Sequence, residues 1–107
     1  MITSDSSKII SESNRYIEAH ISEEITPETL CAFLNISRSK LYRIFENELQ
    51  TGISAYIRSK RLEKSHKLLK QTDFSISEIA KRVGFSDYNY FSRVFKQTYG
   101  KPPKSYR

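Results

Sequence analysis

The side chains of this 107-residue sequence that could take part in chemistry are mainly basic or hydroxyl-bearing, and histidine and cysteine are rare. The two histidines, His20 and His66, are 46 residues apart, and Cys31 is the single cysteine. No H-E-x-x-H pattern, cysteine pair, phosphate-binding glycine loop or nucleophile elbow occurs. We therefore expect no catalytic residue, no metal site and no cofactor, and we do not interpret the chain as an enzyme.

The basic side chains are concentrated in one part of the chain. The overall charge is +6, but residues 1–37 carry two basic and six acidic side chains, whereas residues 38–107 carry sixteen basic and six acidic ones. Clustered lysine and arginine favour a polyanionic partner, because they neutralise phosphates and release counterions. Charge alone leaves two alternatives open, a nucleic-acid-binding surface and an ordinary basic surface.

The composition favours helices. Hydrophobic residues make up 37% of the chain, enough for a modest core, and three glycines and three prolines are too few for the turns of a many-stranded sheet. The start, MITSDSSK, has no apolar run of a signal peptide, and no segment could span a membrane. A lone cysteine cannot form an internal disulfide, which suits a reducing compartment. We expect an all-α protein of the cytoplasm without membrane contact.

One pattern occurs twice along the chain, over residues 30–56 and 79–106, and its matching positions form two blocks. In the first block, the matching positions are 49 residues apart and pair Leu30 with Ile79, Cys31 with Ala80, Leu34 with Val83, Asn35 with Gly84, Ile36 with Phe85 and Ser37 with Ser86. In the second block, they are 50 apart and pair Leu41 with Phe91, Arg43 with Arg93, Ile44 with Val94, Phe45 with Phe95, Leu49 with Tyr99 and Tyr56 with Tyr106. One extra residue therefore lies between Ser86 and Phe91. The match predicts a tandem duplication.

Each repeat has the pattern of two short helices joined by a tight turn. In the second repeat, Ser75 and Glu78 have the spacing of a capping box, so a helix is expected to begin there. Its apolar face comprises Ile76, Ile79, Ala80 and Val83. Gly84 is expected in the left-handed conformation that ends this helix, and Ser86 is expected to cap the next one, over about 87–99. That helix would bury Phe91, Val94, Phe95 and Tyr99.

The first repeat predicts the same arrangement. Thr26 is expected to cap the first helix, with Pro27 at its first position and Asn35 in the place of Gly84. Ser37 is expected to cap a second helix over about 38–49. The inward positions of this repeat are Leu30, Cys31, Leu34, Leu41, Ile44, Phe45 and Leu49. Cys31 is expected to be a small core residue rather than a reactive thiol.

Three further segments complete the expected fold. A helix is predicted at about 6–21, a long linker helix at 54–70 with the stripe Ile57, Leu62, Ser65, Leu68 and Leu69, and a last short turn after Pro102-Pro103. The result is about seven helices, divided into a first helix-turn-helix subdomain at 1–53, the linker at 54–70 and a second subdomain at 71–107. Each subdomain would be a homeodomain-like three-helix unit.

Residues 75–107 resemble the signature of the AraC/XylS family of transcription regulators. The matching positions are Ile79, Ala80, Val83, Gly84, Phe85, Tyr90, Phe91, Arg93, Phe95, Lys96, Gly100, Pro103, Tyr106 and Arg107. Residues 56–69 also resemble the linker helix of the family, so the resemblance covers nearly all of 9–107. Pro102 departs from the pattern, since the family usually has Ser or Thr there. The resemblance implies a sequence-specific DNA-binding module of a bacterial transcription regulator, in which the second helix of each unit enters the major groove.

By position in the family pattern, base contacts are expected at Ser39, Tyr42, Arg43, Tyr88, Asn89, Ser92 and Arg93. Arg43 and Arg93 are the strongest candidates, because arginine pairs bidentately with guanine and both lie at equivalent points of the duplication. Phosphate contacts are expected among Arg38, Lys40, Lys60, Arg61, Lys96, Lys101 and Lys104. Tyr42 and Tyr88 could instead cover the edge of the core. Asp87 is expected to compensate a helix dipole, and Tyr56 and Tyr106 to anchor packing.

The expected partner is a double-stranded DNA operator with two non-identical half-sites about 10 base pairs apart. The resemblance also implies RNA polymerase as a partner and a parent protein with an additional sensing or receiver domain. We expect this chain to be the C-terminal domain of a longer regulator, and the alternative is a free-standing regulator made of the two units alone. The alternative is a basic helical protein-interaction module with an acidic partner.

Overall fold

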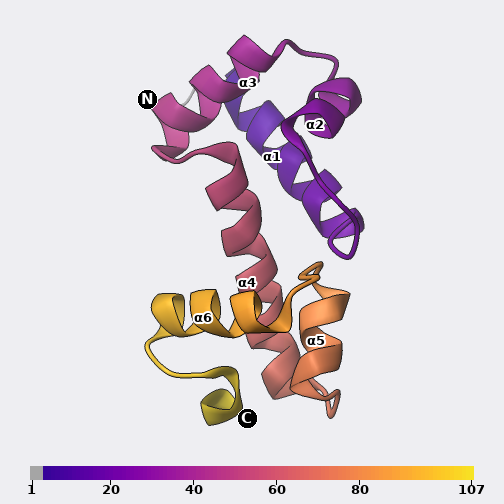
Figure 1. The fold of residues 1–107 in the computed structure, drawn as a ribbon. Helices are drawn as coiled ribbons and strands as arrows, with labels where there is room; N and C mark the ends of the chain where they lie inside the picture. The colour runs from indigo at the N-terminus through magenta and orange to yellow at the C-terminus, as the bar shows by residue number, and fades with distance from the viewer. Residues whose placement is uncertain (1–3) are drawn as a thin grey trace. The chain divides into compact units, whose positions relative to one another are not determined.

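The computed structural model describes residues 4–107, and within them it contains six α-helices and no strand (Figure 1). The helices are α1 (Ser4–Ala19), α2 (Pro27–Leu34), α3 (Arg38–Ile44), α4 (Ile53–Gln71), α5 (Ile76–Arg82) and α6 (Tyr88–Tyr99). A π-helical turn, Phe45–Leu49, extends α3, and a 3-10 turn, Pro103–Tyr106, follows α6. The all-α prediction is confirmed, and the expected seventh helix is this 3-10 turn. Residues 1–3 of the predicted first subdomain lie outside the described residues.

The chain forms two compact units. Unit 1 contains residues 4–20 and Glu24–Ser59, and unit 2 contains Ile21–Glu23 and Lys60–Arg107. The linker helix α4, predicted at 54–70 as a segment of its own, is shared between them, with the boundary after Ser59.

In unit 1, side-chain caps begin α2 and α3, and a left-handed residue ends α2. Thr26 Oγ1 accepts the N–H of Thr29 at 3.1 Å, while Thr29 Oγ1 accepts the N–H of Thr26 at 3.0 Å, so the two threonines form a capping box. Asn35 ends α2 in the left-handed conformation with φ 55°, and Ser37 Oγ accepts the N–H of Lys40 at 3.1 Å to begin α3. The helix-turn-helix predicted for the first repeat is therefore present.

The second helix of this repeat changes its pitch before it ends. The helix predicted over 38–49 is α3 followed by the π-helical turn Phe45–Leu49, and it stops at Gln50, which is left-handed with φ 54°. Leu41 and Phe45 are fully buried, and Tyr56 packs edge-on against Phe45 with ring centroids 5.1 Å apart. Tyr56 also donates a hydrogen bond to Asn14 of α1. Its predicted role as a packing anchor is confirmed.

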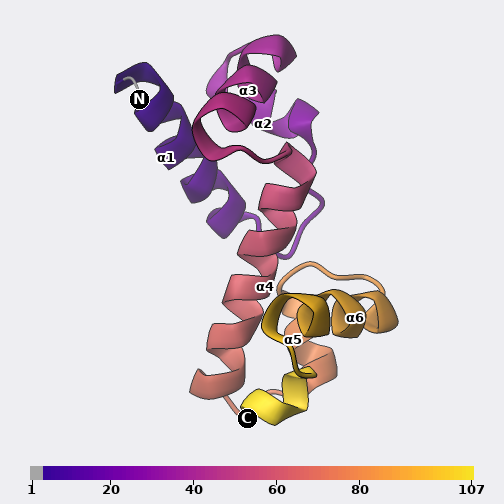
Figure 2. The ribbon, with the colours of Figure 1, turned by 90° about the vertical axis from the view of Figure 1, so that its left-hand side faces the viewer.

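Unit 2 has its core between α5, α6 and the second part of α4 (Figure 2). The buried members of this core are Leu62, Leu69, Ile79, Ala80, Phe91, Val94 and Phe95. Tyr106 of the terminal turn packs against Phe95 and Tyr99, with ring centroids 5.7 and 6.0 Å away, and against His66 at 5.2 Å. These contacts confirm Tyr106 as a packing residue.

The start of α6 differs from the prediction. Asp87, not Ser86, is its N-cap, because Asp87 Oδ1 accepts the N–H groups of Asn89 at 2.9 Å and Tyr90 at 3.2 Å. The extra residue after Ser86 shifts the helix start by one position relative to the first repeat. The capping box at Ser75 is also only half as predicted, since Ser75 accepts the N–H of Glu78 but the Glu78 carboxylate pairs with Arg82 at 3.2 Å.

Candidate nucleic-acid interface

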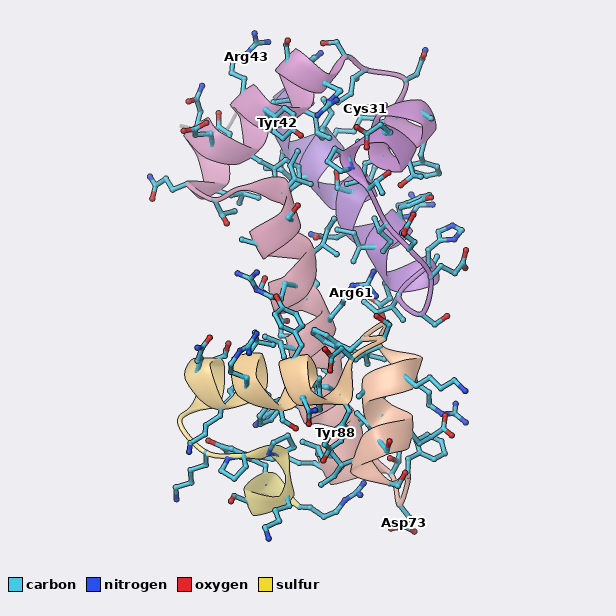
Figure 3. The ribbon with its side chains drawn as sticks, in the orientation of Figure 1. Cys31, Tyr42, Arg43, Arg61, Asp73 and Tyr88 are labelled. Atoms are coloured by element: carbon cyan, nitrogen blue, oxygen red, sulfur yellow. The ribbon has the colours of Figure 1, made fainter. Side chains whose placement is uncertain are left out.

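The outward face of α3 presents three of the expected base-contacting side chains. Ser39, Tyr42 and Arg43 are exposed, whereas Leu41 and Ile44 on the opposite face are buried. Figure 3 shows the Arg43 side chain projecting away from the helix. Tyr42 is 38% exposed, which favours a surface role over cover for the core. Burial of the apolar face fixes the rotation of α3, so the polar face must point to solvent.

Two cations at the start of α3 are paired with acidic residues of the preceding helices. Nη1 of Arg38 lies 3.1 Å from Oε1 of Glu28 in α2, and its Nη2 donates to the Tyr42 hydroxyl at 3.0 Å. The hydrogen bond to Tyr42, more than the nearby charges, raises the pKa of Arg38. Nζ of Lys40 lies 3.0 Å from Oδ2 of Asp5 in α1. Arg38 and Lys40, two of the expected phosphate contacts, therefore have carboxylate partners within unit 1.

The outward face of α6 is built in the same way. Tyr88, Asn89 and Arg93 are exposed, and Ser92 is half-buried. Phe91 and Phe95 are fully buried on the opposite face. The Arg93 guanidinium lies 5.3 Å from the ring centroid of Tyr90, a distance at which a cation is attracted to the face of the ring. The structure thus brings together the four expected base-contacting residues of the second repeat on one helix face.

The expected phosphate contacts of unit 2 differ in exposure. Lys96, Lys101 and Lys104 are exposed. Lys60 is partly buried, and its Nζ lies 3.6 Å from Glu63 Oε2. The exposed lysines are the ones that a phosphate could reach without breaking an internal contact.

Arg61 is the expected phosphate contact whose placement departs from the prediction. Arg61, labelled in Figure 3, is only 8% exposed. Its guanidinium donates to the carbonyls of Val83 at 2.8 Å, Glu23 at 2.8 Å and Ile21. Burial lowers its pKa, and the three carbonyls compensate for lost water. We therefore leave Arg61 out of the phosphate contacts. The spacing of residues along α4 could have indicated this burial. Arg61 lies four residues from both Ile57 and Ser65, and both of these are buried on the same stripe of the helix.

Arg107 plays a similar part at the C-terminal end of α4. Its guanidinium donates to the carbonyls of Thr72 at 2.9 Å and Phe74, and its Nε to Leu69 at 3.4 Å. The carbonyls at a helix C-terminus lack partners within the helix, so a cation is favourable there. Arg107 is part of the family pattern, but nothing in the sequence indicated that its side chain would bind these carbonyls.

The part of the chain that the structure describes holds no group of three or more His, Cys, Asp and Glu side chains able to bind a metal ion. None of its helices is long and apolar enough to cross a membrane.

Comparisons with known proteins give one family. A family model described as "Helix-turn-helix domain" matches residues 30–107. Regulatory protein PocR of Salmonella typhimurium is 34% identical over 93 residues, which are 87% of this chain and 31% of that protein. This chain thus spans about a third of the length of the curated relatives it matches.

Two solved structures agree with this assignment. An AraC-type transcriptional regulator from Chromobacterium violaceum is 30% identical with a TM-score of 0.90, covering 98% of this chain and 94% of the other. The C-terminal domain of AraT, a response regulator from Geobacillus stearothermophilus, is 37% identical with a TM-score of 0.82, covering 92% and 83%. The fold agrees with these matches, since the chain has two helix-turn-helix units with Arg43 and Arg93 on the outward faces of their second helices. The chain therefore belongs to the AraC/XylS family of transcription regulators and is a DNA-binding domain of that family.

Proposed function

We propose that α3 and α6 are the recognition helices and that each enters the major groove of duplex DNA with its outward face. The observation that carries the proposal is the outward position of Arg43 and Arg93, at equivalent points of the two repeats, on helices whose opposite faces are buried. A guanidinium there can donate two hydrogen bonds to the O6 and N7 atoms of guanine. Ser39, Tyr42, Tyr88, Asn89 and Ser92 are the neighbouring base contacts.

The cations around these helices contact phosphates and set the register of the protein on DNA. In unit 2 these are Lys96, Lys101 and Lys104, and in unit 1 they include Lys40, which exchanges Asp5 for a phosphate on binding. Lys60 would have to leave Glu63 in the same way.

The linker helix α4 contains no glycine or proline that could act as a hinge. We therefore propose that the two half-sites on the DNA lie about 10 base pairs apart. Inserting about five base pairs between the half-sites should reduce the affinity to that of a single half-site.

The relatives are about three times as long as this chain, and AraT is a response regulator. We infer that the domain serves a longer bacterial protein with a sensing or receiver domain, that it acts in the cytoplasm on an operator, and that it activates transcription through RNA polymerase. Nothing in the charge or exposure of the described residues favours the alternative of a protein-interaction module over DNA.

The proposal is tested by fluorescence anisotropy on a duplex that the protein selects from a randomised pool. Arg43→Ala and Arg93→Ala should each weaken binding by about 1–3 kcal/mol and relax the preference at one base step. Lys101→Ala, which removes an exposed cation outside the helices, should weaken all duplexes alike. Equal losses of the arginine variants on selected and random DNA would show that neither side chain contacts a base.

A further inference from the structure

The side chain of Arg38 is held in place by two neighbours within unit 1. Glu28 lies 3.1 Å from one end of the guanidinium, and the Tyr42 hydroxyl accepts from the other end at 3.0 Å. The guanidinium carbon also lies 5.5 Å from the centroid of the Tyr42 ring. Arg38 and Glu28 are each 59% exposed at the side chain, so the group lies at the surface on the outward side of α3.

Such an exposed ion pair contributes little to the stability of a fold. Its effect is on the arginine itself, because the carboxylate cancels much of the charge that would attract any phosphate. It also restricts a long side chain to one geometry, so that less conformational entropy is lost when the guanidinium makes a further hydrogen bond. Both effects weaken general attraction to DNA and strengthen a directed contact.

The hydrogen bonding of the group also defines what it can recognise. Tyr42 uses its oxygen to accept from Arg38, so its proton is available for donation to a third partner. The guanidinium likewise keeps N–H groups that neither Glu28 nor Tyr42 uses, and it can only donate. A major-groove edge with adjacent acceptors, such as O6 and N7 of guanine, fits this set of donors, whereas the amino group of cytosine does not.

We propose that Glu28 is a positioning residue that converts Arg38 and Tyr42 into a joint contact for an acceptor-rich base edge, rather than leaving Arg38 as a phosphate contact. This inference rests on the proposed role of α3 as a recognition helix. It adds a residue outside both recognition helices, on α2, to those that determine which sequence is bound.

The test uses the 107-residue chain and measures anisotropy with duplexes selected from a randomised pool, together with versions in which each base pair is substituted in turn. Glu28→Gln should lower the preference at one position by about tenfold, while affinity for a scrambled duplex stays equal or rises. Tyr42→Phe should relax the same position, and the double variant should lose little more than either single one, because the three residues act together.

Glu78→Gln is the matched control, because it removes the same charge from the first helix of the other helix-turn-helix, where the carboxylate pairs with Arg82 of its own helix. It should leave every base preference unchanged. Uniform strengthening of all duplexes by Glu28→Gln, with preferences intact, would show that Glu28 only repels phosphates and would overturn the inference. Additive effects of Glu28→Gln and Tyr42→Phe would overturn it as well. Failure of the unaltered protein to select any sequence would instead count against the proposed function.

Discussion

Gly84 meets two physical requirements that no other residue could meet together. Its φ of 96° lies in the region that side-chain-bearing residues rarely adopt, and a Cβ placed there would overlap the guanidinium of Arg61 and the carbonyl of Ile21. The turn of the second helix-turn-helix and the buried contacts of Arg61 therefore share one position. A change at Gly84 strains the backbone and displaces a buried charge from its acceptors.

We predict that Gly84→Ala lowers the free energy of unfolding by at least about 3 kcal/mol, because it adds loss of the Arg61 hydrogen bonds to the backbone strain. Gly100→Ala is the matched control, since Gly100 has φ 85° but a Cβ added to it would meet nothing within 4 Å. Gly100→Ala should lower the free energy of unfolding by only about 1–2 kcal/mol, the cost of holding a side-chain-bearing residue in the left-handed conformation. Urea unfolding measures both, and equal losses would contradict the role given to the Arg61 contact.

Cys31 provides a prediction about pH. Burial raises the pKa of this thiol above its ordinary value, the charge of Arg38 opposes this rise, and Glu28 adds to it. A raised pKa means less thiolate at a given pH, so at pH 8 the native protein should react with iodoacetamide more slowly than the urea-unfolded chain. Because the folded state holds this proton more tightly, stability should fall as the pH rises above the ordinary thiol pKa. Equal alkylation rates in the two states would contradict the assignment.

The start of α6 depends on a carboxylate rather than on the serine before it. Asp87 accepts two main-chain N–H groups, so Asp87→Ala should lower the free energy of unfolding by about 0.5–2 kcal/mol. Asp87→Asn keeps an acceptor and should cost less. Ser86→Ala is the control at the predicted position and should have little effect. Thermal or urea unfolding compares the three variants, and a larger loss for Ser86→Ala would show that the cap is misassigned.

The helices and their buried faces could be predicted because each has a local signal in the sequence. Thr26, Ser37 and Ser75 are caps in the structure as predicted, and Asn35 and Gly84 take the expected left-handed conformation. The π-helical turn Phe45–Leu49, which ends at Gln50, has no such signal in the sequence.

The candidate site was harder to predict than the fold. Outward residues such as Arg43 and Arg93 follow from subtracting the buried face of each helix, and both are exposed as this subtraction requires. The burial of Arg61 could not be predicted in this way, because it depends on main-chain carbonyls 22 to 40 residues away in the chain. The ion pair of Arg38 likewise depends on Glu28 of another helix. Tertiary contacts of this kind are not visible in spacing within one element.

At the scale of the whole molecule, the charge divides with the two units. Unit 1 has six basic and seven acidic side chains, a net charge of −1, whereas unit 2 has twelve basic and five acidic ones, a net charge of +7. The pairing of Arg38 with Glu28 and of Lys40 with Asp5 reduces the free positive charge of unit 1 further. Unit 2 should therefore supply most of the general attraction to phosphates, and unit 1 should depend more on directed contacts.

This division predicts how binding depends on salt. If roughly 6–8 phosphates are contacted, the slope of log K against log salt concentration should be about −5 to −7 for the unaltered chain. Replacing Lys101 and Lys104 of unit 2 with glutamine should make this slope shallower by about 2, since each lost phosphate contact removes about 0.9. The matched pair Lys8→Gln and Arg15→Gln removes two exposed cations of unit 1 and should change the slope by less than about 0.5. Anisotropy titrations of a selected duplex over a range of salt concentrations give all three slopes. Equal changes for the two pairs would show that both units attract phosphates alike, and the division of roles between them would have to be abandoned.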